Sequence, residues 1–167
     1  MSGLVIQTSS ERAIVMTRTF NAPRHLVFDA WTKPELLKRW FGTPPGWTMP
    51  ICEVDLRPGG TYRYVMHGPA GEEVVMRGEY REVVPPERLV TTEVFAGFSE
   101  VGWRPEDATV STMVLIEKEG RTTWTATVVY PSKEVRDAAL QSPMESGMNA
   151  SFDKLTELLA TLVGSND

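Results

Sequence analysis

The strongest constraint on the fold comes from one long amphipathic segment at the C-terminal end of the chain. Between Pro143 and Val163, apolar residues recur at helical spacing and form one stripe, made of Met144, Met148, Phe152, Leu155, Leu158, Leu159 and Leu162. As a helix this segment is roughly 30 Å long. Ser142, followed by a proline and by Glu145, is a typical helix start. We therefore expect Ser142 to cap this helix and KEVRDAALQ to form a separate short helix before it.

The middle of the chain, between residues 51 and 130, alternates apolar and polar residues with the period of a β-strand. Turn sequences such as RPGG, GPAGEE and PPER separate about six strands, which we expect to pair in antiparallel order. In the last strand the threonines fall on one face. We expect the opposite face, with Trp124, Ala126, Val128 and Tyr130, to be buried.

Two short helices are expected between a first strand and this run of strands. Thr32 and Glu35 have the spacing of a capping box at the start of the second helix. That helix ends at Trp40 and Phe41, and the loop GTPPGWTMP, which carries Trp47, follows it. A proline-rich loop with a tryptophan beside this helix end is our first candidate for the mouth of a pocket.

This order of elements predicts an α+β fold. We expect a curved antiparallel sheet of about six or seven strands, wrapped around the long C-terminal helix, with two short helices after the first strand. Residues 1–10 are predicted to be a flexible arm or a weak first strand, 11–163 a single domain, and 164–167 a frayed end. A chain of 167 residues with 41% hydrophobic and 23% charged residues suits one globular domain and excludes a disordered or coiled-coil chain.

The net charge and the cysteine content limit the classes of partner and cofactor that the chain can bind. The net charge of −5 lacks the basic footprint that nucleic acid demands, and no apolar run is long enough for membrane insertion. The single cysteine, Cys52, makes neither an internal disulfide nor a cysteine-rich metal cluster. The N-terminus lacks the pattern of a signal peptide, so we expect a cytoplasmic protein.

Four stretches of the chain resemble one bacterial family. The runs NAPRHLVFDAWTKPELLKRWFG, CEVDLRPGGTYRYVM, GEYREVVPPERLV and SFDKLTELLATL are similar to the family of heat-shock protein 90 ATPase activator homologues. That family belongs to the START-like, or SRPBCC, helix-grip superfamily. The resemblance implies a helix-grip fold with a hydrophobic cavity between sheet and helix. It implies no single reaction, because the superfamily includes ligand carriers, cyclases and hydrolase-like members.

Two sets of charged residues could carry chemistry. Glu53 and Asp55 lie two apart, and paired carboxylates can divide acid and base roles. The alternative that we favour is structural: Asp55 pairs with Arg57 and shapes the turn before the two glycines. Arg77 and Glu79 share one strand face, where they either orient a polar ligand from inside or form a solvated pair outside. We favour the solvated pair.

Metal and nucleophile chemistry find little support in the sequence. His25 and His67 are isolated from each other and from other ligand-type residues at metal-binding spacing. Cys52 falls in a set of apolar residues, and a lone buried cysteine usually behaves as a small hydrophobe. We therefore predict no metal and no cofactor.

The aromatic and methionine residues are the most informative set. Met adapts to varied ligands, and buried Tyr and Trp offer polar tips inside an apolar lining. Plain core packing is the alternative. The predicted ligand-binding residues are Trp40, Phe41, Trp47, Tyr62, Tyr64, Met66, Trp124, Met144, Met148 and Phe152.

These residues predict a binding protein for a small hydrophobic or aromatic molecule. Gly147 leaves room beside Met144 and Met148, whereas the leucines further along should pack solidly, so we expect the cavity under the first half of the last helix. A cyclase, dehydratase or hydrolase that uses Tyr62, Tyr64 or an inward carboxylate is the enzyme alternative. A co-chaperone-like module with a protein partner is a third possibility.

Overall fold

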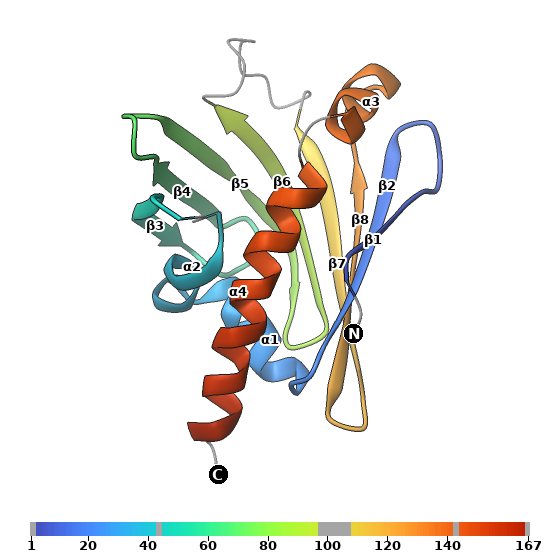
Figure 1. Cartoon of the computed structure of the whole chain (residues 1–167). Helices are drawn as coiled ribbons and strands as arrows, with labels where there is room; N and C mark the ends of the chain where they lie inside the picture. Colours follow the sequence, from blue (N-terminus) through green and yellow to red (C-terminus); the bar gives the residue numbers. More distant parts are fainter. Residues whose placement is uncertain (1–2, 43–44, 97–107, 142–143, 166–167) are drawn as a thin grey trace.

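The structure is a computed structural model of the whole chain, and it describes residues 3–42, 45–96, 108–141 and 144–165 (Figure 1). Its elements follow one another as β1 (Val5–Thr8), β2 (Ala13–Phe20), α1 (Arg24–Thr32), α2 (Pro34–Trp40), β3 (Thr48–Val54), β4 (Thr61–His67), β5 (Glu73–Val84), β6 (Arg88–Ala96), β7 (Thr109–Lys118), β8 (Arg121–Val129), α3 (Lys133–Gln141) and α4 (Met144–Ser165). None of the helices in these ranges is long and apolar enough to cross a membrane.

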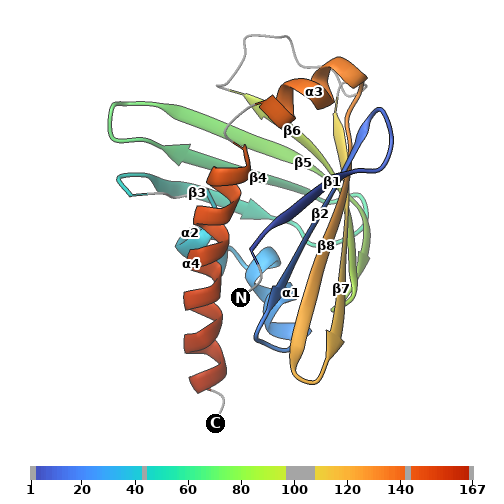
Figure 2. The same cartoon turned by 45° about the vertical axis from the view of Figure 1, so that its right-hand side comes forward.

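The strands form one antiparallel sheet in the order β1-β2-β8-β7-β6-β5-β4-β3. The predicted α+β fold is confirmed: the sheet curves around α4, and α1 and α2 follow β2 (Figures 1 and 2). The described sheet has eight strands. Val5–Thr8 accounts for the extra one, because this part of the expected arm pairs with β2 at the sheet edge.

Side-chain alternation places the core between sheet and helix. The face of β8 with Trp124, Ala126 and Val128 is buried, as its sequence predicts, and Tyr130 directly after the strand is buried too. From α4, Phe152 and the leucines at 155, 158 and 159 are buried against the sheet. These three leucines are therefore packed as predicted, whereas Leu162, the last of the stripe, is half-buried.

The helix starts differ in detail from the prediction. The capping box at Thr32 is wrong: Thr32 is the last residue of α1, and its hydroxyl donates to the Phe28 carbonyl at 2.8 Å. Lys33 precedes α2 without a side-chain cap, and Pro34 begins that helix. The predicted break between α3 and α4 is confirmed, whereas the predicted cap, Ser142, lies outside the described residues.

The RPGG turn after β3 has a structural role. Gly59 adopts a φ of +84°, and a side chain on Gly60 would collide with the Asp55 carbonyl. The backbone N–H of Gly59 donates to the Tyr80 carbonyl, and the N–H of Tyr80 donates to the Gly60 carbonyl, both at 2.8 Å. An exposed ion pair between Asp55 and Arg57 closes the turn, which supports the structural interpretation of these residues.

Candidate functional site

A cluster of aromatic rings joins α4 to the two short helices and to β8. The Phe152 ring lies 4.9 Å from that of Trp124, 6.0 Å from Trp40 and 5.7 Å from Phe20, measured between centroids. Trp31 stacks on Trp124 at 5.7 Å with nearly parallel planes. These contacts pack the middle of α4 against the inner face of the sheet.

The structure brings most of the predicted ligand-binding residues into this core. Phe41 contacts Tyr64 at 5.4 Å and Tyr62 contacts Tyr64 at 5.0 Å, so the cluster extends across β4. Met66 is buried next to Gly42, just past the end of α2. Trp40, Tyr62, Tyr64, Met66, Trp124 and Phe152 are buried, whereas Phe41 and Met148 are half-buried. That they line a ligand site stays a prediction.

Two members of the predicted set stand apart. Trp47 is half-buried beside Gly68, in the turn between β4 and β5. The side chain of Met144 lies outside the described residues, although its backbone begins α4.

A row of inward-facing residues crosses the sheet beyond the aromatic cluster. Strand register places Tyr62 opposite Gly78, Glu93 opposite Thr109, and Val110 opposite Val129. Arg77 pairs with Val94, so the next pair along these two antiparallel strands is Gly78 with Glu93. In the same way, the pairing of Val110 with Val129 places Thr109 beside Tyr130. We call Tyr62, Gly78, Glu93, Thr109 and Tyr130 the polar row.

The polar row lies near one end of the fold. β6 and β8 both run toward the end where α3 lies and where α4 begins (Figures 1 and 2). Glu93 is near the C-terminal end of β6, and Tyr130 directly follows β8. The row therefore sits toward the first half of α4, where the sequence predicts the cavity.

Gly78 makes room for the tyrosine at the start of this row. A Cβ at Gly78 would lie 1.8 Å from the Thr92 carbonyl oxygen and 2.8 Å from the Tyr62 hydroxyl. The Tyr62 hydroxyl donates to that same carbonyl at 2.6 Å. The missing side chain thus lets the phenol lean across β5 toward β6, and the next inward positions, Thr91 and Ser111, are also polar and buried.

Glu93 is the acidic residue of the row. Burial raises the pKa of its carboxyl from 4.5 to about 7. The residue as a whole is half-buried. A carboxyl that titrates near neutral pH can donate or accept a proton under ordinary conditions.

The tyrosines around it behave differently. Burial, and then the charge of Glu93, raises the pKa of Tyr62 far above its ordinary value and that of Tyr130 to about 12. Burial also raises the pKa of Tyr64 and Tyr80. These phenols stay protonated at neutral pH, so they serve as hydrogen-bond donors and aromatic surface rather than as bases.

Arg18 is a second buried charged group on the inner face. Its guanidinium donates to Asp153 of α4 at 2.9 Å and lies over the rings of Phe20 and Phe152 at 5.5 and 5.6 Å. This contact ties β2 to α4. Among the described residues, Arg18 Nε, Trp31 Nε1 and Trp124 Nε1 are buried N–H donors without an acceptor.

The sequence prediction missed Glu93 and Arg18. Each interrupts a regular alternation: TTEVF sets Glu93 on the face of Thr91, and MTRTF sets Arg18 on the face of Met16 and Phe20. A charged residue within an inward alternation is the signal that could have identified both.

The other chemical candidates lie outside this region. Arg77 and Glu79 are exposed, as favoured, and Glu53 forms an exposed pair with Arg63. Burial raises the pKa of the Cys52 thiol to about 11, which disfavours the thiolate. No cluster of three or more metal-ligand residues occurs in the described ranges.

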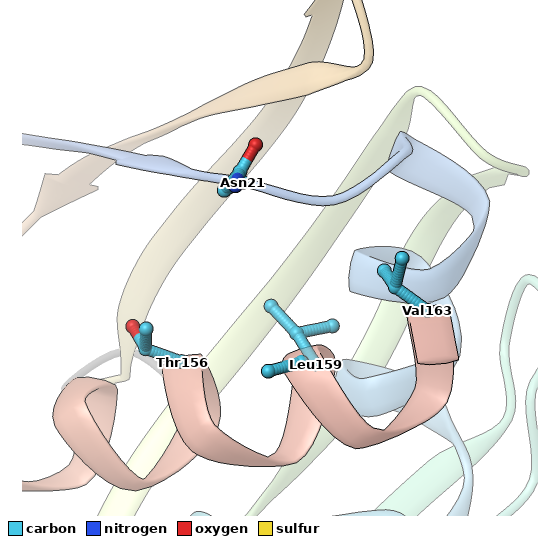
Figure 3. Close-up of a pocket in the computed structure, with 5 residues that line it drawn as sticks. Asn21, Thr156, Leu159 and Val163 are labelled. Carbon is cyan, nitrogen blue, oxygen red and sulfur yellow. The ribbon is translucent and has the colours of Figure 1, made fainter. Parts of the chain in front are cut away.

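Two open grooves flank the C-terminal half of α4. One, of about 290 Å³, is lined by Thr156, Leu159 and Val163 on the side of α4 that faces Asn21 (Figure 3). The other, of about 250 Å³, lies between Arg39 of α2 and Lys154 of α4. Both are surface grooves beside solidly packed leucines, so neither corresponds to the predicted cavity.

An antiparallel sheet curved around one long C-terminal helix, with two short helices inserted after β2, defines a START-like, helix-grip protein. The sequence profile described as activator of Hsp90 ATPase homolog 1-like protein matches residues 21–160. The chain belongs to this family. Comparison with curated proteins finds no match.

Solved structures agree with this assignment. A crystal structure of a Rhodobacter sphaeroides protein is 30% identical, with a TM-score of 0.84 over 95% of this chain and 99% of that one. A solution structure from Staphylococcus epidermidis is 29% identical, with a TM-score of 0.78 over 94% of each chain. An Hsp90 activator from Plasmodium falciparum is 23% identical, with a TM-score of 0.53 over 71% of this chain and 73% of that one, which shows the fold alone.

Proposed function

We propose that this protein binds a small, largely apolar or aromatic molecule between the sheet and the first half of α4. Glu93 would hold the polar end of that molecule, and the aromatic and methionine residues would contact its body. One observation carries the proposal. Glu93, an ionisable side chain, lies on the inner face of the sheet next to the buried side chains of Tyr62 and Thr91.

The composition of the inner face supports binding over simple packing. Around Glu93 the sheet presents tyrosine, threonine and serine side chains, where a core of this size would ordinarily be aliphatic. Ligand pockets combine an apolar lining with a few fixed polar groups, and the polar row next to the aromatic cluster has that composition.

A neutral fluorescent probe, N-phenyl-1-naphthylamine, tests the proposal. We expect saturable binding with enhanced emission to the folded protein. Met148→Trp should abolish this binding, because the larger side chain projects from the half-buried face of α4 into the same space. Ile116→Trp, on the exposed end of β7, is the matched control and should bind the probe normally.

Circular dichroism would establish that both variants fold. Equal probe binding by wild type and folded Met148→Trp would contradict a site under the first half of α4. Absence of probe binding to the wild type would contradict the proposed function itself.

An enzyme acting on a bound substrate is the second candidate, and Glu93 favours it. The carboxyl is the inward acid or base that this alternative requires, and its pKa lies near the pH at which general acid–base catalysis is most efficient. The rings of Tyr62 and Tyr130 would then flank the bound substrate. Turnover that disappears in Glu93→Gln, while probe binding persists, would distinguish an enzyme from a carrier.

A further inference from the structure

We infer that the ligand carries a cationic group, such as an ammonium, which pairs with the Glu93 carboxylate beside the ring of Tyr62. The inference rests on the proposed function and deepens it by specifying the chemistry of the ligand's polar end.

The first argument is charge balance around Glu93. Among the described residues, burial is the cause of the raised pKa of Glu93, and no basic side chain of these residues acts on the carboxyl. Arg18 in β2 pairs with Asp153, and Arg12, just before β2, donates to the Tyr130 carbonyl. A buried carboxylate is costly unless a counter-charge lies near it; none comes from the described residues, and a cationic ligand would supply one.

The second argument is the aromatic surroundings. All four tyrosines of the chain lie on the inner face or directly beside it. The rings of Tyr62 and Tyr80 are 5.3 Å apart, and those of Tyr62 and Tyr64 are 5.0 Å apart. Tyrosine faces attract organic cations through their negative quadrupole, and cages of such rings bind alkylammonium groups.

The third argument is the set of groups that face Glu93 from neighbouring elements. Register gives Gly78 on β5, Thr109 on β7, Tyr62 on β4 and Tyr130 after β8. The two phenols are neutral at physiological pH because their pKa values are raised. Glu93 is therefore the titrating group of the row, and ionisation near pH 7 switches the row from neutral to anionic.

A matched pair of naphthalenes separates charge from shape. (1-Naphthylmethyl)trimethylammonium is a permanent cation, and 1-(2,2-dimethylpropyl)naphthalene is its uncharged carbon isostere. Both are measured by displacement of N-phenyl-1-naphthylamine. At pH 8 we expect the cation to bind at least about tenfold more tightly than the isostere, the contribution of one compensated charge with an aromatic contact.

The dependence on pH follows from the titration of Glu93. A cation binds the carboxylate form, so its affinity should fall about tenfold from pH 8 to pH 6 as Glu93 takes up a proton. The affinity of the isostere should stay constant. Glu93→Gln should remove both the cation preference and the pH dependence while the isostere still binds. Glu79→Gln, the same change on the outer face of β5, should change neither.

The outcomes distinguish the inference from the proposed function. If the isostere binds as well as the cation, or if 1-naphthoate binds better than either, the cation inference is overturned and the binding function stands. If wild type binds none of the three compounds, the proposed function fails, and the inference fails with it. A cation preference that survives in Glu93→Gln also overturns the inference.

Discussion

The inward-facing carboxyl of Glu93 supplies an ionisable group on the inner face, and its burial lowers the stability of the fold when it is ionised. Its pKa is about 7 in the folded protein, against 4.5 for the unperturbed group, so the folded state holds an extra proton between these values. Stability therefore falls as pH rises from about 4.5 to about 7 and stays lower above that window. The difference corresponds to about 3 kcal/mol.

Urea denaturation of wild type and Glu93→Gln across pH 4–8 tests this predicted dependence of stability on pH. We expect Glu93→Gln to be the more stable protein at pH 8, with an advantage that shrinks as the pH falls through the window. A constant difference between the two proteins at every pH would mean that Glu93 is not buried in the way the structure shows. Glu79→Gln serves as the surface control.

Gly78 is the residue on which the polar row depends. Gly78→Ala places a methyl group against the Thr92 carbonyl and the Tyr62 hydroxyl. Strand β5 and these two groups must then move apart. We expect a loss of at least about 2 kcal/mol in the free energy of unfolding. Gly147→Ala, on an exposed helical position with open space around it, should instead be neutral or stabilising by up to about 1 kcal/mol. Equal effects of the two substitutions would contradict the strand register described here.

Between elements, the ion pair of Arg18 with Asp153 connects β2 to α4. Arg18 is only 8% exposed, so a guanidinium that loses its partner cannot regain full hydration. We expect Asp153→Asn to cost about 1 kcal/mol, and Glu53→Gln, which breaks an exposed pair with Arg63, to cost less than about 0.5 kcal/mol. Chemical denaturation of both variants at low and moderate salt gives the comparison. Similar losses in the two variants would show that the Arg18 contact does not fasten the helix.

The elements themselves follow closely from the sequence. The long stripe of α4 and the alternation of β8 predict their buried faces, because each periodicity fixes which side chains share a face. The start of α2 is different. Thr32 has capping-box spacing with Glu35, yet it ends the preceding helix and donates to its carbonyl, since a hydroxyl in the last turn finds that local acceptor first.

The site is harder to predict than the fold for a physical reason. Periodicity assigned Tyr62 and Trp124 to the inner face correctly, but it cannot tell a packed ring from one that lines a ligand site. The polar row depends on register across five strands, and pairing such as that of Tyr62 with Gly78 is not visible in any single segment. The sequence alone shows a charged residue at position 93, but only the register shows that Glu93 lies in one row with Tyr62 and Tyr130.

For the whole molecule, the sheet order implies an uneven distribution of stability. β2 and β8, which are distant in sequence, pair along their length inside the sheet, between β1 and β7, and β8 carries Trp124 against α4. In contrast, α3 leaves Val135 and Leu140 exposed and buries Arg136, which donates to the Ser10 carbonyl at 2.6 Å. Elements with few buried apolar side chains open at low free-energy cost.

Native-state hydrogen exchange should therefore rank α3 among the fastest-exchanging helices and the centre of β8 among the slowest segments. Because α3 lies at the end of the fold toward which β6 carries Glu93, its opening would change access to the polar row (Figure 1). Arg136→Ala should speed exchange in α3 further and leave β8 unchanged, since the substitution removes the contact with Ser10. Lys133→Ala, which breaks an exposed pair with Asp137, is the control and should have a smaller effect. Protection of α3 equal to that of β8, or an equal response to both substitutions, would contradict this distribution of stability.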